Sequence, residues 1–227
     1  MTAAPRLVEV RQNVFKHNDL LARTLRERFR SAGVFVLSLV SSPGAGKTAL
    51  LERTLTELGT RYRVAALVGD LATDNDAARL ARSGAAVRQI TTGTVCHLDA
   101  AMVDSALAGW DLKTLDFLFI ENVGNLVCPA SYDLGEGLRC VMMSVTEGED
   151  KPLKYPTIFN SADIAVITKI DLAAAVEFNR AAADRSIQSV RPGMETLAVS
   201  AKTGAGMPEF LRFLEARRMD SRAAGVP

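Results

Sequence analysis

Residues 34–48 read VFVLSLVSSPGAGKT, and this stretch decides the fold. An apolar run, Val34–Val40, enters a glycine-rich turn, and a helix-forming segment leaves the turn at Thr48. A strand, a glycine-rich turn and a helix in this order make a phosphate-binding loop. Glycines let the backbone N–H groups turn inward around a phosphate, and the helix N-terminus adds its positive dipole end. The stretch therefore predicts a nucleotide-binding α/β domain.

The side chains of this loop predict how a nucleoside triphosphate is held. We expect Lys47 to reach the β- and γ-phosphates and the Thr48 hydroxyl to ligate Mg²⁺. The strict motif begins with glycine, whereas Ser41 stands there in this chain, so we expect a slightly weakened fit. The residues predicted to bind the nucleotide in this loop are Pro43, Gly44, Ala45, Gly46, Lys47, Thr48 and Ala49.

Short apolar runs alternate with amphipathic segments after the loop. Several of these runs are apolar throughout, which indicates strands buried on both faces. Strands are predicted at Val34–Val40, Val64–Gly69, Val87–Ile90, Phe117–Glu121, Cys140–Val145, Ile164–Thr168 and Thr196–Val199. Helices are predicted at Thr48–Leu58, Asp76–Ser83, Leu98–Leu107, Ala173–Val190 and Pro208–Arg217. The alternation predicts an α/β fold with a doubly wound, mostly parallel sheet and helices on both faces.

The ends of the chain differ from this pattern. Apolar residues recur at helical spacing from Pro5 to Arg30 among many basic residues, which predicts an amphipathic helix interrupted near Asn18. We expect this helix (residues 1–32) to pack on the nucleotide-binding domain (residues 33–218). Residues 219–227 are expected to form a flexible tail.

Composition excludes several classes of function. The chain has 227 residues, 48% of them hydrophobic, which suits one globular domain with a full core. A net charge of +1 gives no basis for bulk electrostatic binding to nucleic acid or to an acidic membrane. No apolar run approaches the ~18 residues that suggest a membrane span. The three cysteines and the lack of an export signal favour a cytoplasmic protein with reduced thiols.

Two segments predict a guanine site. Lys169 and Asp171 follow a buried strand, and a carboxylate there accepts hydrogen bonds from guanine N1 and its 2-amino group. Because adenine does not offer this pair of donors, Asp171 favours GTP over ATP, while the stem of Lys169 packs over the base. The usual motif has asparagine where this chain has Thr168, so we expect looser support of the loop. The second guanine loop is predicted at Ser200, Ala201 and Lys202.

Two carboxylates compete for the catalytic magnesium shell. Asp70 ends the strand after the phosphate-loop helix, where it can hold Mg²⁺ or orient the attacking water. Glu121 ends another strand, and Gly124 beside it can donate its N–H to the γ-phosphate. The catalytic residues predicted here are Lys47, Asp70 and Glu121, with Thr48 and Asp70 as magnesium ligands.

Soft metal ligands lie near these switch-like segments. Cys96 and His97 are adjacent, and Cys128 follows Gly124 closely. Thiolate and neutral imidazole suit Zn²⁺ and Ni²⁺. Three ligands do not close a tetrahedral site, so water or a second chain would complete it. Spacing alone supports a metal site and simple core packing equally. Cys140, inside an apolar strand, favours a structural role, and His17, on the N-terminal helix, is expected to be structural or solvated.

Longer segments resemble one family of GTPases. The segments Thr92–Ala100, Phe119–Ala130, Asp133–Gly135 and Thr146–Pro156 resemble HypB, the GTPase family of nickel insertion into [NiFe]-hydrogenase. The resemblance covers nearly all of the chain and implies a SIMIBI-class P-loop GTPase that forms a homodimer when GTP is bound. It also implies that Cys96, His97 and Cys128 bind Ni²⁺ or Zn²⁺ near the dimer interface. The implied partners are a HypA-type nickel chaperone and the hydrogenase large subunit.

Departures from the family pattern limit what is carried over. No cysteine precedes Cys96 and the chain has two histidines, so nickel storage is not expected. Thr94-Val95 stands where relatives often have Lys-Glu. No arginine finger is evident, which predicts slow hydrolysis without a partner, unless Lys151 or Lys154 acts across the dimer. The alternatives are a urease-accessory GTPase, disfavoured by the lack of a Cys-Pro-His motif, and a regulatory G protein whose cysteines are core residues.

Overall fold

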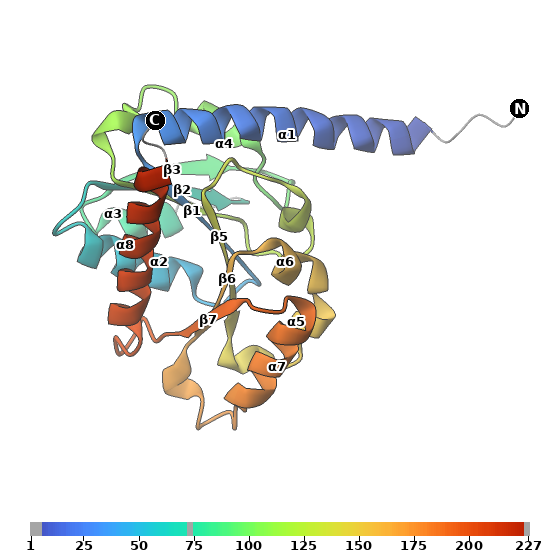
Figure 1. The fold of residues 1–227 in the computed structure, drawn as a ribbon, viewed down its shortest axis with the longest axis vertical. Helices are drawn as coiled ribbons and strands as arrows, with labels where there is room; N and C mark the ends of the chain where they lie inside the picture. The colour runs from blue at the N-terminus through green and yellow to red at the C-terminus, as the bar shows by residue number, and fades with distance from the viewer. Residues whose placement is uncertain (1–5, 72–74, 225–227) are drawn as a thin grey trace, which may run out of the picture.

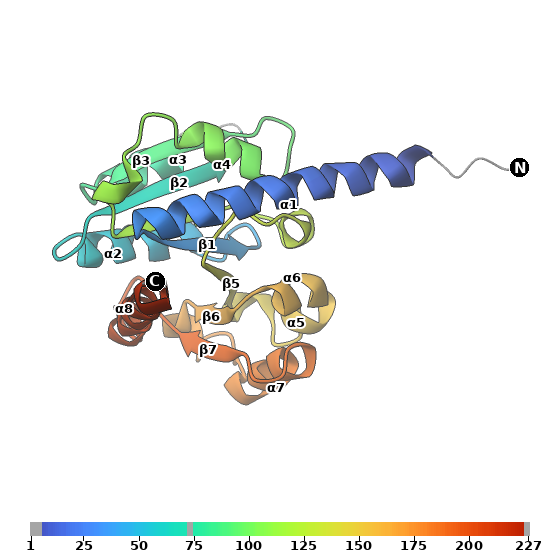
Figure 2. The same ribbon diagram turned by 45° about the horizontal axis from the view of Figure 1, so that its top comes forward.

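The computed structural model describes residues 6–71 and 75–224, and one parallel sheet organises them (Figures 1 and 2). All of its strand pairs are parallel, and the strand order is β3-β2-β4-β1-β5-β6-β7. The strands are β1 (Phe35–Ser41), β2 (Val64–Asp70), β3 (Ala86–Thr91), β4 (Phe117–Glu121), β5 (Leu138–Ser144), β6 (Ile164–Thr168) and β7 (Glu195–Ala198). The predicted fold class is confirmed, and every predicted strand is present within a few residues of its predicted bounds.

Helices cover both faces of the sheet, as alternating apolar side chains of the strands require. One face carries α2 (Lys47–Leu58), α3 (Asn75–Ala81) and α8 (Met207–Ala224). The other face carries α1 (Arg6–Ala32) and α4 (Ala100–Ala106) over β1–β4, and α6 (Pro156–Ser161) and α7 (Arg180–Val190) over β5 and β6. A short helix, α5 (Lys151–Lys154), precedes α6. None of the described helices combines the length and apolar composition needed to cross a membrane.

Helix α1 lies across one face, and its N-terminal part extends past the sheet in both views (Figures 1 and 2). Ala22, Leu25 and Phe29 are buried in the core that α1 shares with α4. The expected interruption near Asn18 is wrong, because α1 is continuous from Arg6 to Ala32. Asn18 is buried and directs its amide at two other segments of the chain, so its polarity serves contacts between elements and not a break in the helix.

Two other boundaries differ from the predictions. Helix α7 begins at Arg180, later than the predicted Ala173, because Asn179 caps it by accepting a hydrogen bond from the Ala182 backbone N–H at 3.0 Å. At the other end, α8 continues to Ala224, so residues 219–224 are helical where a flexible tail was predicted. Arg222 anchors this last turn on the Gly33 carbonyl and the Asp116 carboxylate. Residues 225–227 lie outside the described part of the chain.

Candidate functional site

The phosphate loop joins β1 to α2 at the carboxyl edge of the sheet. Gly44 and Gly46 have φ values of 74° and 97°, a region that favours glycine, so the glycines of the motif are required by the turn itself. Lys47 is buried, and its Nζ donates to Ser41 Oγ at 3.0 Å. Burial lowers the pKa of Lys47, although nearby carboxylates oppose this. Ser41, which replaces the usual glycine, thus supplies a hydrogen-bond acceptor for the loop lysine.

A carboxylate and a hydroxyl meet beside this loop. Thr48 Oγ1 donates to Glu121 Oε1 at 2.7 Å, while Glu121 Oε2 is buried with no hydrogen-bond partner in the described chain. Burial raises the pKa of Glu121 to about 7. A carboxylate oxygen without a partner, next to the hydroxyl oxygen of Thr48, suits a hard cation such as Mg²⁺, which takes oxygen ligands. Thr48 and Glu121, which are in contact, therefore fit Mg²⁺ as a pair. Their direct contact was not predicted from the sequence.

Asp70 faces the same hollow from the end of β2. The hollow holds about 430 Å³ and lies between the phosphate loop, Asp70 and residues 121–124. Gly124 passes close to the loop: a Cβ atom at this position would lie 3.0 Å from Pro43 Cα. Any side chain larger than glycine's would therefore push this segment away from the phosphate loop. Asp70, Glu121 and Gly124 are thus brought together around one hollow beside the phosphate loop.

The predicted base site is tied to the phosphate loop. Thr168 Oγ1 donates to the Ala45 carbonyl at 2.6 Å, and Lys169 Nζ donates to the Gly44 carbonyl at 2.6 Å. The looser support expected from Thr168 is not observed, because its hydroxyl bonds the loop directly. Asp171 Oδ1 accepts from Ser200 Oγ at 2.6 Å, which joins the two guanine loops. The hydroxyl of Ser200 therefore has a positioning contact that the sequence analysis did not assign.

The remaining residues of the second loop lie farther out. Arg53 on α2 donates to the Ala201 carbonyl at 3.0 Å and so links this loop to the phosphate-loop helix. Lys202 is exposed. Ala49 lines the phosphate hollow from the first turn of α2.

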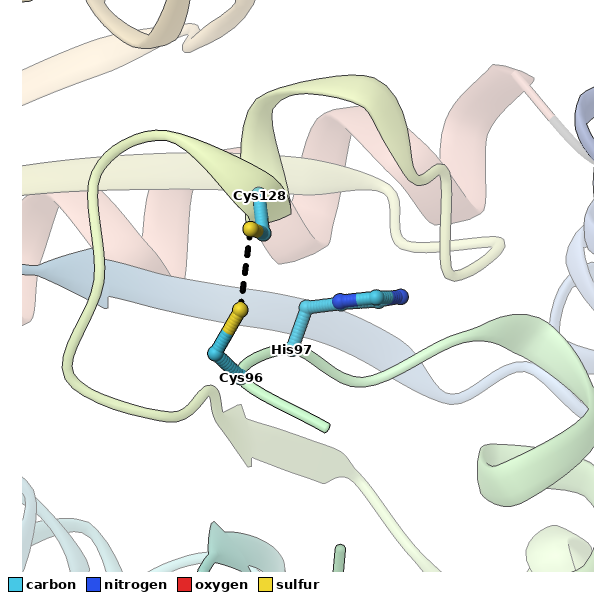
Figure 3. Close-up of side chains that lie close together, drawn as sticks. All are labelled: Cys96, His97 and Cys128. Atoms are coloured by element: carbon cyan, nitrogen blue, oxygen red, sulfur yellow. Dashed lines mark hydrogen bonds between the residues drawn. The ribbon is translucent and has the colours of Figure 1, made fainter. Parts of the chain in front are cut away.

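The three predicted soft ligands converge in space (Figure 3). One ligand atom each from Cys96, His97 and Cys128 lies within 4.8 Å of the other two. The Cys96 and Cys128 sulfur atoms point toward each other at 2.9 Å, and the His97 ring lies beside them (Figure 3). Such clustering is not expected of three unrelated core residues. It favours the metal interpretation, which spacing alone left equal to core packing.

The local environment shifts the pKa of His97 toward its metal-binding form and the pKa of Cys128 away from it. His97 Nδ1 is buried without a hydrogen-bond partner among the described residues, and burial lowers the pKa of His97 despite the nearby Asp99. This shift favours the neutral imidazole, which is the form that binds a metal. Hydrogen bonding to Cys96 and, to a smaller extent, burial raise the pKa of Cys128. A divalent cation would offset that rise by favouring the thiolates.

Two asparagines connect the metal cluster to the phosphate hollow. Asn122, which follows Glu121, is buried and accepts from the Leu98 backbone N–H at 3.0 Å. Asn125 Nδ2 donates to the Cys96 carbonyl at 3.3 Å. The segment that begins at the wall of the phosphate hollow is therefore bonded to the backbone on both sides of His97. Neither asparagine is predicted from the sequence, because only the fold shows that these two loops are adjacent.

Several other predicted residues lie apart from the cluster. Cys140 is buried in the core under α2 and α8, where burial raises its pKa strongly. His17 is exposed. Lys151 pairs with Glu147 at 2.9 Å and is largely buried, whereas Lys154 pairs with Asp150 at 2.8 Å near the surface. Of the two lysines, Lys154 lines the hollow beside Cys128.

Comparison with known proteins also indicates a nucleotide-binding domain. Residues 35–198 match the family model described as CobW/HypB/UreG, nucleotide-binding domain. The hydrogenase maturation factor HypB of Azotobacter vinelandii is 48% identical over 94% of this chain and 70% of its own length. The hydrogenase/urease maturation factor HypB of Helicobacter pylori strain 26695 is 38% identical over 94% of this chain and 89% of its own length.

A solved structure is similar over nearly the whole chain. The crystal structure of HypB from Helicobacter pylori in complex with nickel superposes with a TM-score of 0.85 and 39% sequence identity. The match covers 91% of this chain and 97% of that one.

Proposed function

The chain belongs to the CobW/HypB/UreG family of nucleotide-binding proteins, and we propose that it is a GTP-hydrolysing nickel chaperone for [NiFe]-hydrogenase maturation. The observation that best supports this proposal is that Asn122 and Asn125 hydrogen-bond the wall of the phosphate hollow to the Cys96-His97 segment. A change in that wall on nucleotide binding would move the metal ligands. Nickel is the cargo of this cycle, held by Cys96, His97 and Cys128.

The residues around the phosphate hollow support the hydrolytic step. Lys47 would bind the β- and γ-phosphates, and Thr48 with Glu121 or Asp70 would hold Mg²⁺, which neutralises charge developing on the γ-phosphate. Water attacks the γ-phosphorus in line with the leaving oxygen, giving GDP and phosphate. Gly124, which lies against Pro43, would donate its N–H to the γ-phosphate.

Guanine would be selected by Asp171. Its carboxylate is fixed by the Ser200 hydroxyl at 2.6 Å, so its second oxygen can accept from the base at a defined position. Comparable turnover of ATP and GTP would remove this role. Steady-state rates with the two nucleotides, measured with Asp171→Asn as the variant and Lys113→Ala, an exposed lysine outside the nucleotide loops, as the control, test it directly.

The remaining parts of the proposal concern partners and the metal. We infer a homodimer promoted by GTP, with a HypA-type nickel chaperone as donor and the hydrogenase large subunit as acceptor. Zn²⁺ would bind the same three ligands. Relatives named as hydrogenase/urease maturation factors keep a urease role as the second candidate, at lower identity than the hydrogenase-only relative.

The test measures Ni²⁺ stoichiometry and affinity by equilibrium dialysis with GDP and with a non-hydrolysable GTP analogue. A Cys96→Ala, Cys128→Ala double variant should lose the site, whereas Cys140→Ala, which removes a thiol outside the cluster, should keep it. Ni²⁺ affinity should also differ between the two nucleotide states. Equal Ni²⁺ binding by the double variant and the wild type would reject the metal site. An affinity indifferent to nucleotide would reject its coupling to GTP.

A further inference from the structure

The His97 ring lies at the end of a row of aromatic rings that starts on helix α1. His97 stacks on Tyr132 with ring centroids 3.9 Å apart and an interplanar angle of 24°. Tyr132 in turn meets Phe15 of α1 edge to face, with centroids 5.3 Å apart. Three segments distant in sequence thus determine where one imidazole can lie. Because stacking restricts ring rotation, Tyr132 fixes the plane in which the His97 nitrogens are presented.

Asn18 of α1 joins the two loops that carry the soft ligands. Its Oδ1 accepts from the Ala100 backbone N–H at 2.9 Å, just after the Cys96-His97 pair. Its Nδ2 donates to the Asp133 carbonyl at 2.9 Å, in the loop that follows Cys128. The amide uses its donor on one loop and its acceptor on the other. A single buried side chain therefore sets the separation of these loops.

Close backbone packing holds the second loop on the same helix. A Cβ atom at Gly135 would lie 2.7 Å from Leu25 Cβ and 2.8 Å from the Ala22 carbonyl oxygen. Arg26 adds an ion pair with Asp133 at 2.6 Å. This loop cannot slide along α1 without losing these contacts. The support for the metal ligands thus continues into a helix outside the matched nucleotide-binding domain, which begins at residue 35.

We propose that Tyr132 and Asn18 are positioning residues for the metal site. Tyr132 orients the His97 imidazole, and Asn18 holds the Cys96-His97 loop at the correct distance from the Cys128 loop. The proposal rests on the metal-binding role of Cys96, His97 and Cys128 proposed above. Residues that orient metal ligands typically change metal affinity 10–100-fold when replaced, although they touch no metal.

The first experiment titrates Co²⁺ into Tyr132→Ala, Tyr132→Phe and the adjacent surface variant Ser131→Ala. Thiolate-to-cobalt charge transfer reports the cysteines, and the d–d bands report coordination geometry. Tyr132→Ala should weaken Co²⁺ binding roughly tenfold and change the d–d bands, while charge transfer persists. Tyr132→Phe keeps the stacked ring and should restore the wild-type spectrum, and Ser131→Ala should match wild type.

The Asn18 part is tested by Asn18→Leu, which removes both hydrogen bonds at similar volume. Thr24→Ala is the control on the same helix, because its hydroxyl bonds only the Leu20 carbonyl within α1. We expect roughly tenfold weaker Co²⁺ binding for Asn18→Leu and no change for Thr24→Ala. Binding of a GTP analogue, measured in parallel, should stay within about twofold of wild type if the effect is confined to the metal ligands. If Asn18→Leu does not fold, the Tyr132 series still decides the proposal.

Two outcomes separate this inference from the function on which it rests. Should Tyr132→Ala bind Co²⁺ as wild type does while Cys96→Ser abolishes binding, the positioning role is wrong and the metal site stands. Should Cys96→Ser and Cys128→Ser also leave Co²⁺ binding and charge transfer unchanged, the metal site itself is wrong.

Discussion

Strand β4 has an acidic residue at each end, and the two residues differ in their hydrogen bonding and in the direction of their pKa shifts. Asp116, just before the strand, accepts hydrogen bonds from Arg63 and Arg218. Burial opposes ionisation there, but these bonds keep the pKa of Asp116 below its usual range. Glu121, at the other end, keeps one buried oxygen without a partner, and burial raises its pKa to about 7.

This contrast shows how structural and functional polar groups differ in one fold. Arg218 at the amino edge also lies between the Tyr62 and Phe117 rings, so the Asp116 cluster is packed as well as paired. The carboxyl edge leaves Glu121 and His97 with buried atoms that have no partner among the described residues. Such groups are costly unless a ligand satisfies them. Glu121 and His97 are therefore two places where ligands are expected.

The largest expected effect is on hydrolysis at the carboxyl edge. Lys47→Ala removes the buried cation that would contact the transferred phosphate, and we expect kcat for GTP to fall roughly 10²–10³-fold. Single-turnover hydrolysis measures the loss. Arg217→Ala, at an exposed ion pair far from the loop, is the control and should hydrolyse GTP as the wild type does. A Lys47→Ala enzyme that retains more than a tenth of the wild-type rate would contradict the assignment.

The next effect is on stability at the amino edge. Asp116→Asn leaves the buried Arg218 guanidinium without its counter-charge, which should lower the free energy of unfolding by about 2–4 kcal/mol. Urea unfolding measures it. Hydrolysis per folded molecule should not change, because Asp116 lies at the opposite edge from the phosphates. A stable Asp116→Asn protein with altered kcat would reverse the roles given to the two edges.

Glu121→Gln should have the opposite effect on stability, and only at high pH. The folded pKa of Glu121, about 7, lies above its ordinary 4.5, so ionisation is less favourable in the folded state. The wild type therefore loses stability as pH rises through this interval, by up to about 3 kcal/mol. The glutamine variant does not ionise. Without Mg²⁺ and nucleotide, the unfolding curves of the two proteins should coincide near pH 4.5, and Glu121→Gln should be the more stable protein at pH 8. A difference in stability that is the same at both pH values would argue against this.

The smallest effect concerns the contact between the base loop and the phosphate loop. Thr168→Ala removes the hydrogen bond to the Ala45 carbonyl, and we expect about 1 kcal/mol weaker GDP binding, close to fivefold. Thr168→Asn, which restores the usual motif residue, should bind within about threefold of wild type. Isothermal titration of GDP compares them. If Thr168→Ala bound GDP as tightly as wild type, the bond at 2.6 Å would have no role in holding the loop.

The sequence predicted the regular part of this molecule well. Glycines, apolar runs and the motif residues after each strand predicted the fold and the grouping of Lys47, Thr48 and Gly124, because these features depend on local geometry and on parallel strands ending at one edge. It did not predict the contacts of Asn18, Asn122 and Asn125. In the sequence, an asparagine that breaks a helix looks the same as a buried asparagine that joins two loops. Only the approach of distant segments distinguishes these roles.

The base loop's bonds to the Gly44 and Ala45 carbonyls have a consequence for motion. The strand order places β6 and β7 on one side of β1, and β4, β2 and β3 on the other. Through Thr168 and Lys169, the base subsite is anchored to the phosphate loop, whereas the Gly124 wall follows β4 and the Cys96-His97 segment follows β3. A bound guanosine nucleotide would then contact both halves of the sheet and link them. Its departure would free the Gly124 wall and the Cys96-His97 segment, and slower amide exchange around Asn122 in the loaded protein would be its signature.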